Sequence, residues 1–181
     1  MKKISKIFFL TGIIISYILC AVSAFLLLRP EFSEPFVLLV LMLGGFFYTS
    51  FIWFLLWFKA WAAIQDGDVR MTPRRAVLFS LIPFFNFYWM FQLIWGFAKD
   101  YNAYIERHNI VSRKLPSVLF LSYVVLVLIN AIFANVFAFF GFILLHISFI
   151  STLVIVWMVC DAINGIHTMH LPSFNMDSSS S

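Results

Sequence analysis

Residues 72–99 read TPRRAVLFSLIPFFNFYWMFQLIWGFAK, and this stretch decides how often the chain crosses a membrane. Its central part, residues 76–98, is almost entirely apolar. As a straight helix it would be about 35 Å long, which is enough to span a hydrocarbon core of roughly 30 Å. Length alone therefore predicts a crossing, but local chemistry and charge predict a different path.

The local chemistry argues against a straight helix. Pro83 removes a backbone hydrogen bond near the middle of the segment, and Asn86 adds a polar side chain just beyond it. Tyr and Trp favour the headgroup interface, whereas Tyr88 and Trp89 would lie near the bilayer centre in a straight crossing. We therefore predict a re-entrant pair of half-helices broken near residues 83–86, or a half-helix followed by an interfacial helix.

The distribution of positive charge favours the same path. If the segment crosses, the outer side receives five of the 12 Lys and Arg residues, namely Arg29 and the four in the next loop. If the segment returns to the cytoplasmic side, only Arg29 lies outside, which is the distribution that the positive-inside rule favours. The four residues of that loop are Lys99, Arg107, Arg113 and Lys114.

Composition sets the class of the whole protein. Hydrophobic residues make up 63% of the chain and charged residues 11%, which indicates a multi-pass, all-α integral membrane protein. The net charge of +4 comes from residues beside apolar segments, so it predicts topology control and no nucleic-acid partner. Cys20 and Cys160 lie inside apolar runs without a CxxC motif, which is typical of packing residues.

We predict a single membrane domain over residues 1–172, followed by a disordered tail over 173–181. Four transmembrane helices and one Pro-broken segment make up this domain; the alternative is five transmembrane helices. The exact turn between the last two helices is left open by the sequence. The helices are expected near residues 7–28, 36–64, 73–98 (broken near 83–86), 118–137 and 142–162.

The N-terminal apolar run has basic residues before it, as a signal peptide would. However, the run continues past Ala24 to Leu28, which makes it long enough to span. We therefore expect an uncleaved first helix with a cytoplasmic N-terminus. An even number of crossings then places the C-terminus in the cytoplasm as well.

Arg70, Arg74 and Arg75 form a basic group at the start of the broken segment, where Thr72-Pro73 has the form of a helix start. Cations in a first helical turn oppose the helix dipole, so local helix stability does not account for them. Two explanations remain: retention on the cytoplasmic side, which we favour, and binding of anionic lipid headgroups.

Other polar residues within or near apolar segments are candidates for function. Pro83 and Asn86, with Asn130 and His146, are candidates for structural breaks or for binding a solute. A neutral His146 that is hydrogen-bonded between helices is the alternative interpretation. Near the end of the chain, three residues are candidate metal ligands, although no further ligand has a recognisable spacing: Asp161, His167 and His170.

The segments WFKAW, IQDG, TP, AV, IPFFNFYW and FAKD resemble a group of small bacterial membrane proteins classed as a domain of unknown function. The pattern is an aromatic, basic helix end, a Ser/Thr-Pro turn and an Ile-Pro-x-x-Asn segment. It covers roughly residues 57–100. The resemblance implies a bacterial inner-membrane location, and it brings no assigned activity and no catalytic residues.

These patterns favour a non-enzymatic membrane component that assembles with itself, with partner proteins or with lipid. No cofactor is predicted. The first alternative is a small transporter or channel that uses the broken helix at Pro83 and Asn86. The second is a metal-dependent membrane enzyme, which ranks last because such enzymes usually have denser His and Asp signatures. Substrate, partners and oligomeric state do not follow from the sequence.

Overall fold

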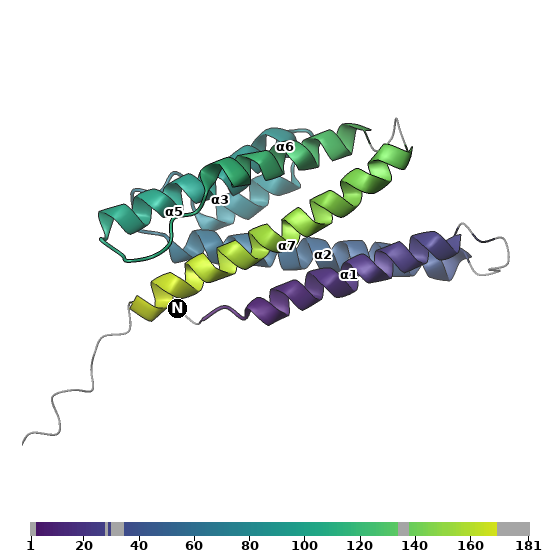
Figure 1. The fold of residues 1–181 in the computed structure, drawn as a ribbon, viewed down its shortest axis with the longest axis horizontal. Coiled ribbons are helices and arrows are strands. Elements are labelled where there is room, and N and C mark those ends of the chain that lie inside the picture. Colours follow the sequence, from purple (N-terminus) through teal and green to yellow (C-terminus); the bar gives the residue numbers. More distant parts are fainter. Residues whose placement is uncertain (1–2, 28, 30–34, 134–137, 170–181) are drawn as a thin grey trace, which may run out of the picture.

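The computed structural model describes residues 3–27, 29, 35–133 and 138–169, and all of its regular elements are helices (Figure 1). The all-α class is thus confirmed for these residues, while the predicted tail at 173–181 lies outside them. Within residues 91–95 the helix has π geometry. The elements are α1 (Lys6–Leu27), α2 (Pro35–Ala63), α3 (Pro73–Leu78), η1 (Phe79–Leu81), α4 (Phe85–Met90), η2 (Phe91–Trp95), α5 (Gly96–Arg107), α6 (Ser117–Phe133) and α7 (Ala138–Met169).

Helices α1 and α2 form a close antiparallel pair. The Ser16 hydroxyl donates a hydrogen bond to the carbonyl oxygen of Gly45 at 2.6 Å. A Cβ atom at Gly45 would lie only 2.8 Å from the Cys20 sulfur, so the missing side chain allows this approach. Small residues at such contacts are typical of helix pairs inside membranes.

Helix α7 packs against both α1 and α6. The rings of Tyr17 on α1 and Phe149 on α7 stack with centroids 3.8 Å apart. On the other side, the Tyr123 and Thr152 hydroxyls lie 2.9 Å apart and hydrogen-bond α6 to α7. Helix α7 therefore joins the N-terminal helix pair to the second half of the chain.

The start of α1 and the end of α7 meet at one end of the bundle (Figure 1). The Asn164 side chain accepts a hydrogen bond from the Ile4 backbone N–H at 2.8 Å and donates one to the Ile4 carbonyl at 3.0 Å. Beside these two hydrogen bonds, Lys6 and Asp161 form an ion pair.

We call this end of the bundle the basic end. The C-terminal part of α2 reaches it, because the Lys59 ammonium lies 5.8 Å from the centre of the Phe9 ring near the start of α1. Arg29, which follows α1, lies at the opposite end. All other described Lys and Arg residues lie at the basic end: Lys3, Lys6, Lys59, Arg70, Arg74, Arg75, Lys99, Arg107, Arg113 and Lys114.

The best-buried side chains lie near the basic end, where α2, α5, α6 and α7 converge. Trp57 and Trp61 of α2 are fully buried, as are Phe97 and Tyr101 of α5 and Phe120 of α6. Phe97 contacts both tryptophans edge to face, with ring centroids 5.6 Å apart in each case. The aromatic side chains of α2 are therefore a packing surface for the second half of the chain.

Three helical stretches in the described residues are long and apolar enough to cross a membrane: Lys6–Leu27, Pro35–Ala63 and Ile143–His167. Ser117–Ile132 is a shorter apolar helix. Their outward faces carry exposed apolar side chains, among them Ile7, Phe36 and Val118. A membrane protein is compatible with this surface, because lipid tails cover apolar side chains without cost.

The observed helices lie close to the predicted positions, with two clear differences. The helix predicted to end at residue 98 continues as α5 to Arg107. Helix α7 begins at Ala138 and ends at Met169, so it is longer at both ends than the predicted 142–162. It continues past 162 because Ile163 and Ile166 are buried against the bundle. Residues 134–137, at the end of the helix predicted at 118–137, lie outside the described residues.

Candidate functional site

The candidate site is a helical hairpin formed by residues 73–98. Its inbound arm, α3 and η1, begins at Pro73 with Thr72 as the capping residue, as the sequence predicts. The Thr72 side chain accepts a hydrogen bond from the Arg75 backbone N–H at 3.4 Å. The outbound arm, from α4 onward, runs back alongside the inbound arm and continues into α5.

The two arms are joined by a γ-turn centred on Phe84. The Phe85 N–H donates a hydrogen bond to the Pro83 carbonyl at 2.6 Å. Phe84 has φ 61° and ψ −44°, which is the rare and strained form of this turn. Its side chain is 87% exposed, so the hairpin presents an aromatic residue at its tip.

Aromatic residues hold the two arms together. The indole N–H of Trp89 on the outbound arm donates to the carbonyl oxygen of Ala76 on the inbound arm at 2.9 Å. The Trp89 ring also meets Phe79 edge to face, with centroids 4.7 Å apart, and stacks on Phe85. These aromatic side chains therefore close the hairpin.

The outbound arm is anchored to α2 where its helix widens to π geometry. The buried indole N–H of Trp61 donates to the carbonyl oxygen of Leu93 at 3.2 Å. Leu93 lies within the π segment Phe91–Trp95. Such widened turns change the backbone hydrogen bonding of a helix and are often found at functional sites.

At the base of the hairpin, Arg70 and Asp100 form an ion pair across the two flanking segments. The Arg70 Nε lies 2.8 and 2.9 Å from the two carboxylate oxygens, and the closest Nη contact is 2.7 Å. The Asp100 side chain is only 12% exposed, whereas the Arg70 side chain is 42% exposed. Arg70 also donates to the Gln92 side-chain oxygen at 3.4 Å. The two ends of the hairpin are thus held together at the basic end.

A second ion pair attaches the loop after α2 to the end of α5. Arg107 donates to the Asp66 carboxylate at 2.6 Å, and His108 Nε2 lies 3.2 Å from the same oxygen. The hydrogen bond from Arg107 is the main cause that lowers the pKa of Asp66 below its ordinary value. Asp66 and Arg107 therefore fix the loop that leads into the hairpin.

Arg74 and Arg75 differ from Arg70, although the sequence groups the three. Both are exposed on α3, and neither has an acidic partner within the described part of the chain. Of the three predicted headgroup ligands, Arg70 is held by Asp100, whereas Arg74 and Arg75 face outward.

The other polar candidates belong to different parts of the fold. Asn86 lies in the hairpin, and its backbone N–H donates to the Ile82 carbonyl at 3.0 Å. Asn130 on α6 donates to the Ser148 hydroxyl on α7 at 3.1 Å. His146 lies on α7 with its ring edge-on to Tyr17 of α1. Asn130 and His146 thus contact neighbouring helices.

The candidate metal ligands do not assemble in the described residues. Asp161 is paired with Lys6, and His170 lies outside the described residues. His167 is near the end of α7 and half-buried. The described part of the chain contains no group of three His, Cys, Asp or Glu side chains that could hold a metal ion.

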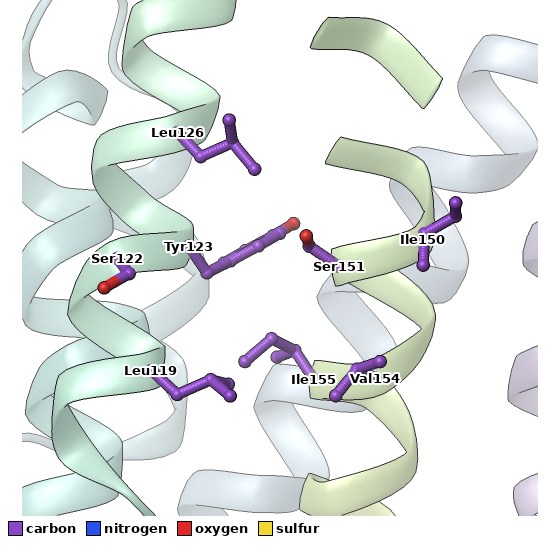
Figure 2. Close-up of a pocket in the computed structure, with 8 residues that line it drawn as sticks. All are labelled: Leu119, Ser122, Tyr123, Leu126, Ile150, Ser151, Val154 and Ile155. Atoms are coloured by element: carbon purple, nitrogen blue, oxygen red, sulfur yellow. The ribbon is translucent and has the colours of Figure 1, made fainter. Parts of the chain in front are cut away.

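A separate pocket of about 230 Å³ lies between α6 and α7. Figure 2 shows Tyr123 reaching from α6 toward Ser151 of α7 across this space. The Tyr123 hydroxyl is already hydrogen-bonded to Thr152. Apart from three hydroxyl groups the lining is apolar, and it contains no ionisable acid, Lys, Arg or His: Leu119, Ser122, Tyr123, Leu126, Ile150, Ser151, Val154 and Ile155.

The sequence predicts the break near residues 83–86 but not the residues that stabilise the observed hairpin. Asp100 follows the segment directly, and its opposite charge to Arg70 was a usable signal. The indole N–H groups of Trp61 and Trp89 donate hydrogen bonds to the backbone carbonyls of Leu93 and Ala76, which the sequence does not predict.

No protein-family model, no curated protein and no solved structure matches this chain. The family resemblance of residues 57–100 therefore stays a prediction.

Proposed function

We propose that the protein is a non-enzymatic component of a bacterial inner membrane, with four crossing helices and a hairpin that enters and leaves on the cytoplasmic side. The crossings are α1, α2, α6 and α7. Residues 3–6 and the end of α7 then lie in the cytoplasm, and Arg29 lies outside. The protein acts through contacts of this apolar and basic surface with lipid and with other membrane proteins or copies of itself.

The Arg70–Asp100 ion pair is the observation that carries this proposal. It joins the residues on either side of the hairpin, at the end of the bundle that also contains the Lys6–Asp161 pair. If that end is cytoplasmic, every described Lys and Arg except Arg29 is cytoplasmic. This is the distribution that the positive-inside rule favours.

The length of the inbound arm supports the same arrangement. Residues 73–81 form one short α-helix and one 3₁₀ turn. Together they extend for roughly 15 Å, about half of a hydrocarbon core of roughly 30 Å. The hairpin therefore reaches the middle of the bilayer and turns there.

The surface of the hairpin suits contact with lipid. Its tip exposes Ile82, Phe84 and Phe87. Backbone groups near the turn are satisfied internally, since Phe85 and Asn86 both donate to carbonyls of the preceding residues. Irregular backbone inside a membrane requires such partners because lipid offers none.

Cysteine labelling tests the topology. In a variant without Cys20 and Cys160, single cysteines are placed at Asp68, Val111 and Arg29, all of which are exposed. Intact bacterial cells are treated with a membrane-impermeant maleimide. We expect Arg29→Cys to react in intact cells, and Asp68→Cys and Val111→Cys to react only after the membrane is permeabilised. Reaction of Asp68→Cys and Val111→Cys from opposite sides would show five crossings and overturn the hairpin.

Native mass spectrometry from a mild detergent tests the mode of action. We expect a defined assembly of copies, a co-purifying membrane protein or retained phospholipid. A lipid-free monomer that is unaffected by added lipid would contradict the proposal. Cross-linking in membranes before solubilisation controls for assemblies that the detergent dissociates.

A further inference from the structure

The cations at the basic end fall into two groups. Six of the ten are engaged: Lys6 pairs with Asp161, Arg70 with Asp100, Arg107 with Asp66, and Lys114 with Glu106, while Lys99 lies over the Trp95 ring and Lys59 near the Phe9 ring. The other four have no ion pair in the described residues: Lys3, Arg74, Arg75 and Arg113. Arg74 and Arg75 are adjacent, exposed and without an acidic partner in the described residues. Two neighbouring guanidinium groups on α3 therefore leave their charge uncompensated within the described chain.

The exposed face of α3 and η1 continues from these cations toward the hairpin tip. Leu78 follows Arg74 by one helical turn, and Leu81 and Ile82 follow by about two turns. All three apolar side chains are exposed. The opposite face, which includes Ala76 and Ser80, is buried against the outbound arm. On this face, positive charge lies at the base of the hairpin, and apolar side chains lie between the base and the tip.

This arrangement matches the chemistry of one class of molecule. A phospholipid has a phosphate at the membrane surface and acyl chains directly beneath it. Guanidinium groups bind phosphate through paired N–H donors, and binding is strongest where no carboxylate competes. Arg74 and Arg75, which have no acidic partner in the described residues, therefore complement an anionic headgroup.

We infer that this face of α3 and η1 binds an anionic glycerophospholipid of the cytoplasmic leaflet. Arg74 and Arg75 hold its phosphate, and its acyl chains lie along Leu78, Leu81 and Ile82. Arg70 is not a ligand of the phosphate, because its guanidinium group is paired with the Asp100 carboxylate. The inference rests on the proposed orientation of the hairpin.

Spin-labelled lipids test this binding in nanodiscs of phosphatidylcholine that contain a small fraction of labelled phosphatidylglycerol or labelled phosphatidylcholine. We expect the wild-type protein to immobilise phosphatidylglycerol preferentially. The double variant Arg74→Gln/Arg75→Gln should lose this preference, by about fivefold for each cation removed. Because both side chains are exposed, the variant should keep its thermal midpoint.

The matched control is Lys3→Gln/Arg113→Gln, which removes two other exposed cations from the same end of the bundle. We expect it to keep the preference for phosphatidylglycerol. Equal losses in both double variants would show a general surface potential and overturn the site. Excess glycerol phosphate should not release the labelled lipid; complete release would indicate a site for free phosphate and overturn the role of the acyl chains.

The two proposals fail in distinguishable ways. If Asp68→Cys and Val111→Cys react from the same side but Arg74→Gln/Arg75→Gln keeps full lipid preference, only the lipid site is wrong. If the two cysteines react from opposite sides, the proposed orientation of the hairpin is wrong, and the lipid site, which rests on that orientation, is wrong as well.

Discussion

The indole nitrogen of Trp89 lies 2.9 Å from the carbonyl oxygen of Ala76, and this hydrogen bond joins the two arms of the hairpin. The same carbonyl also accepts from the Ser80 hydroxyl at 3.0 Å, so loss of the indole N–H would not leave it without a donor. The ring of Trp89 additionally packs on Phe79 and Phe85. The contribution of the N–H can therefore be separated from that of the ring.

Trp89→Phe removes the N–H and keeps an aromatic ring. We expect the free energy of unfolding to fall by about 1 kcal/mol, the usual net value of a neutral hydrogen bond. Trp89→Ala also removes the ring and should cost about 3 kcal/mol or more. Unfolding in mixed detergent micelles measures both. Trp157→Phe is the control, because Trp157 is exposed on α7 and should lose almost nothing.

The Arg70–Asp100 pair predicts two unequal single substitutions. Arg70→Gln leaves the Asp100 side chain, which is 12% exposed, without its cation, and this should cost about 2 kcal/mol. Asp100→Asn leaves the more exposed guanidinium to water and should cost about 1 kcal/mol. The double variant should cost less than the sum of the two in a double-mutant cycle.

The Lys114–Glu106 pair provides the control for this cycle, since both of its side chains are more than 60% exposed. Lys114→Gln should change the free energy of unfolding by less than about 0.5 kcal/mol. Equal costs for Arg70→Gln and Asp100→Asn, with full additivity, would contradict a stabilising ion pair between Arg70 and Asp100.

Phe84→Gly should stabilise the protein in detergent. Phe84 has a positive φ of 61°, a conformation that costs a bulky residue about 1–2 kcal/mol and glycine much less. Its exposed side chain makes few contacts that could be lost. Phe87→Gly is the matched control: Phe87 is also exposed but lies inside α4, so glycine should destabilise by about 1 kcal/mol. Thermal midpoints measure both, and destabilisation by Phe84→Gly would contradict the strained turn.

Asp66 predicts a loss of stability in acid. Arg107 lowers the pKa of Asp66 in the folded protein below the ordinary value of about 3.9. A carboxyl whose folded pKa is lowered stabilises the fold above its unfolded pKa, and this contribution is lost as the pH falls through that region. The thermal midpoint of the wild-type protein should therefore decrease as the pH is lowered below about 4, and that of Asp66→Asn should decrease less. Asp68→Asn, at a side chain that is 75% exposed, should follow the wild-type profile.

Much of the fold follows from the sequence because the length of an apolar run limits where a membrane helix can lie. The predicted helices at 7–28 and 36–64 compare with Lys6–Leu27 and Pro35–Ala63 in the structure. The break near residues 83–86 follows from Pro83, which cannot donate a backbone hydrogen bond. The observed turn at residues 83–85 lies inside this interval.

The features that the sequence does not predict are contacts between residues far apart in the chain. Asn164 binds the backbone of Ile4 across 160 positions, and Arg70 binds Asp100 across 30. Hydrophobic periodicity does not encode such pairings. The π geometry at Phe91–Trp95, where the Leu93 carbonyl accepts from the Trp61 indole N–H, has no sequence signature either. Hydrophobic periodicity likewise does not separate Arg70, which pairs with Asp100, from Arg74 and Arg75, which have no acidic partner in the described residues.

The γ-turn at Phe84 has a mechanical consequence. In the proposed orientation the hairpin ends at half depth, so α3, η1 and α4 displace lipid from the inner leaflet only. The molecule is then broader on its cytoplasmic side than on its outer side. A bilayer accommodates such a wedge by bending away from the broad side or by enriching lipids whose shape compensates for it. One backbone reversal at a single phenylalanine would thereby link the fold of this protein to the curvature of the membrane around it.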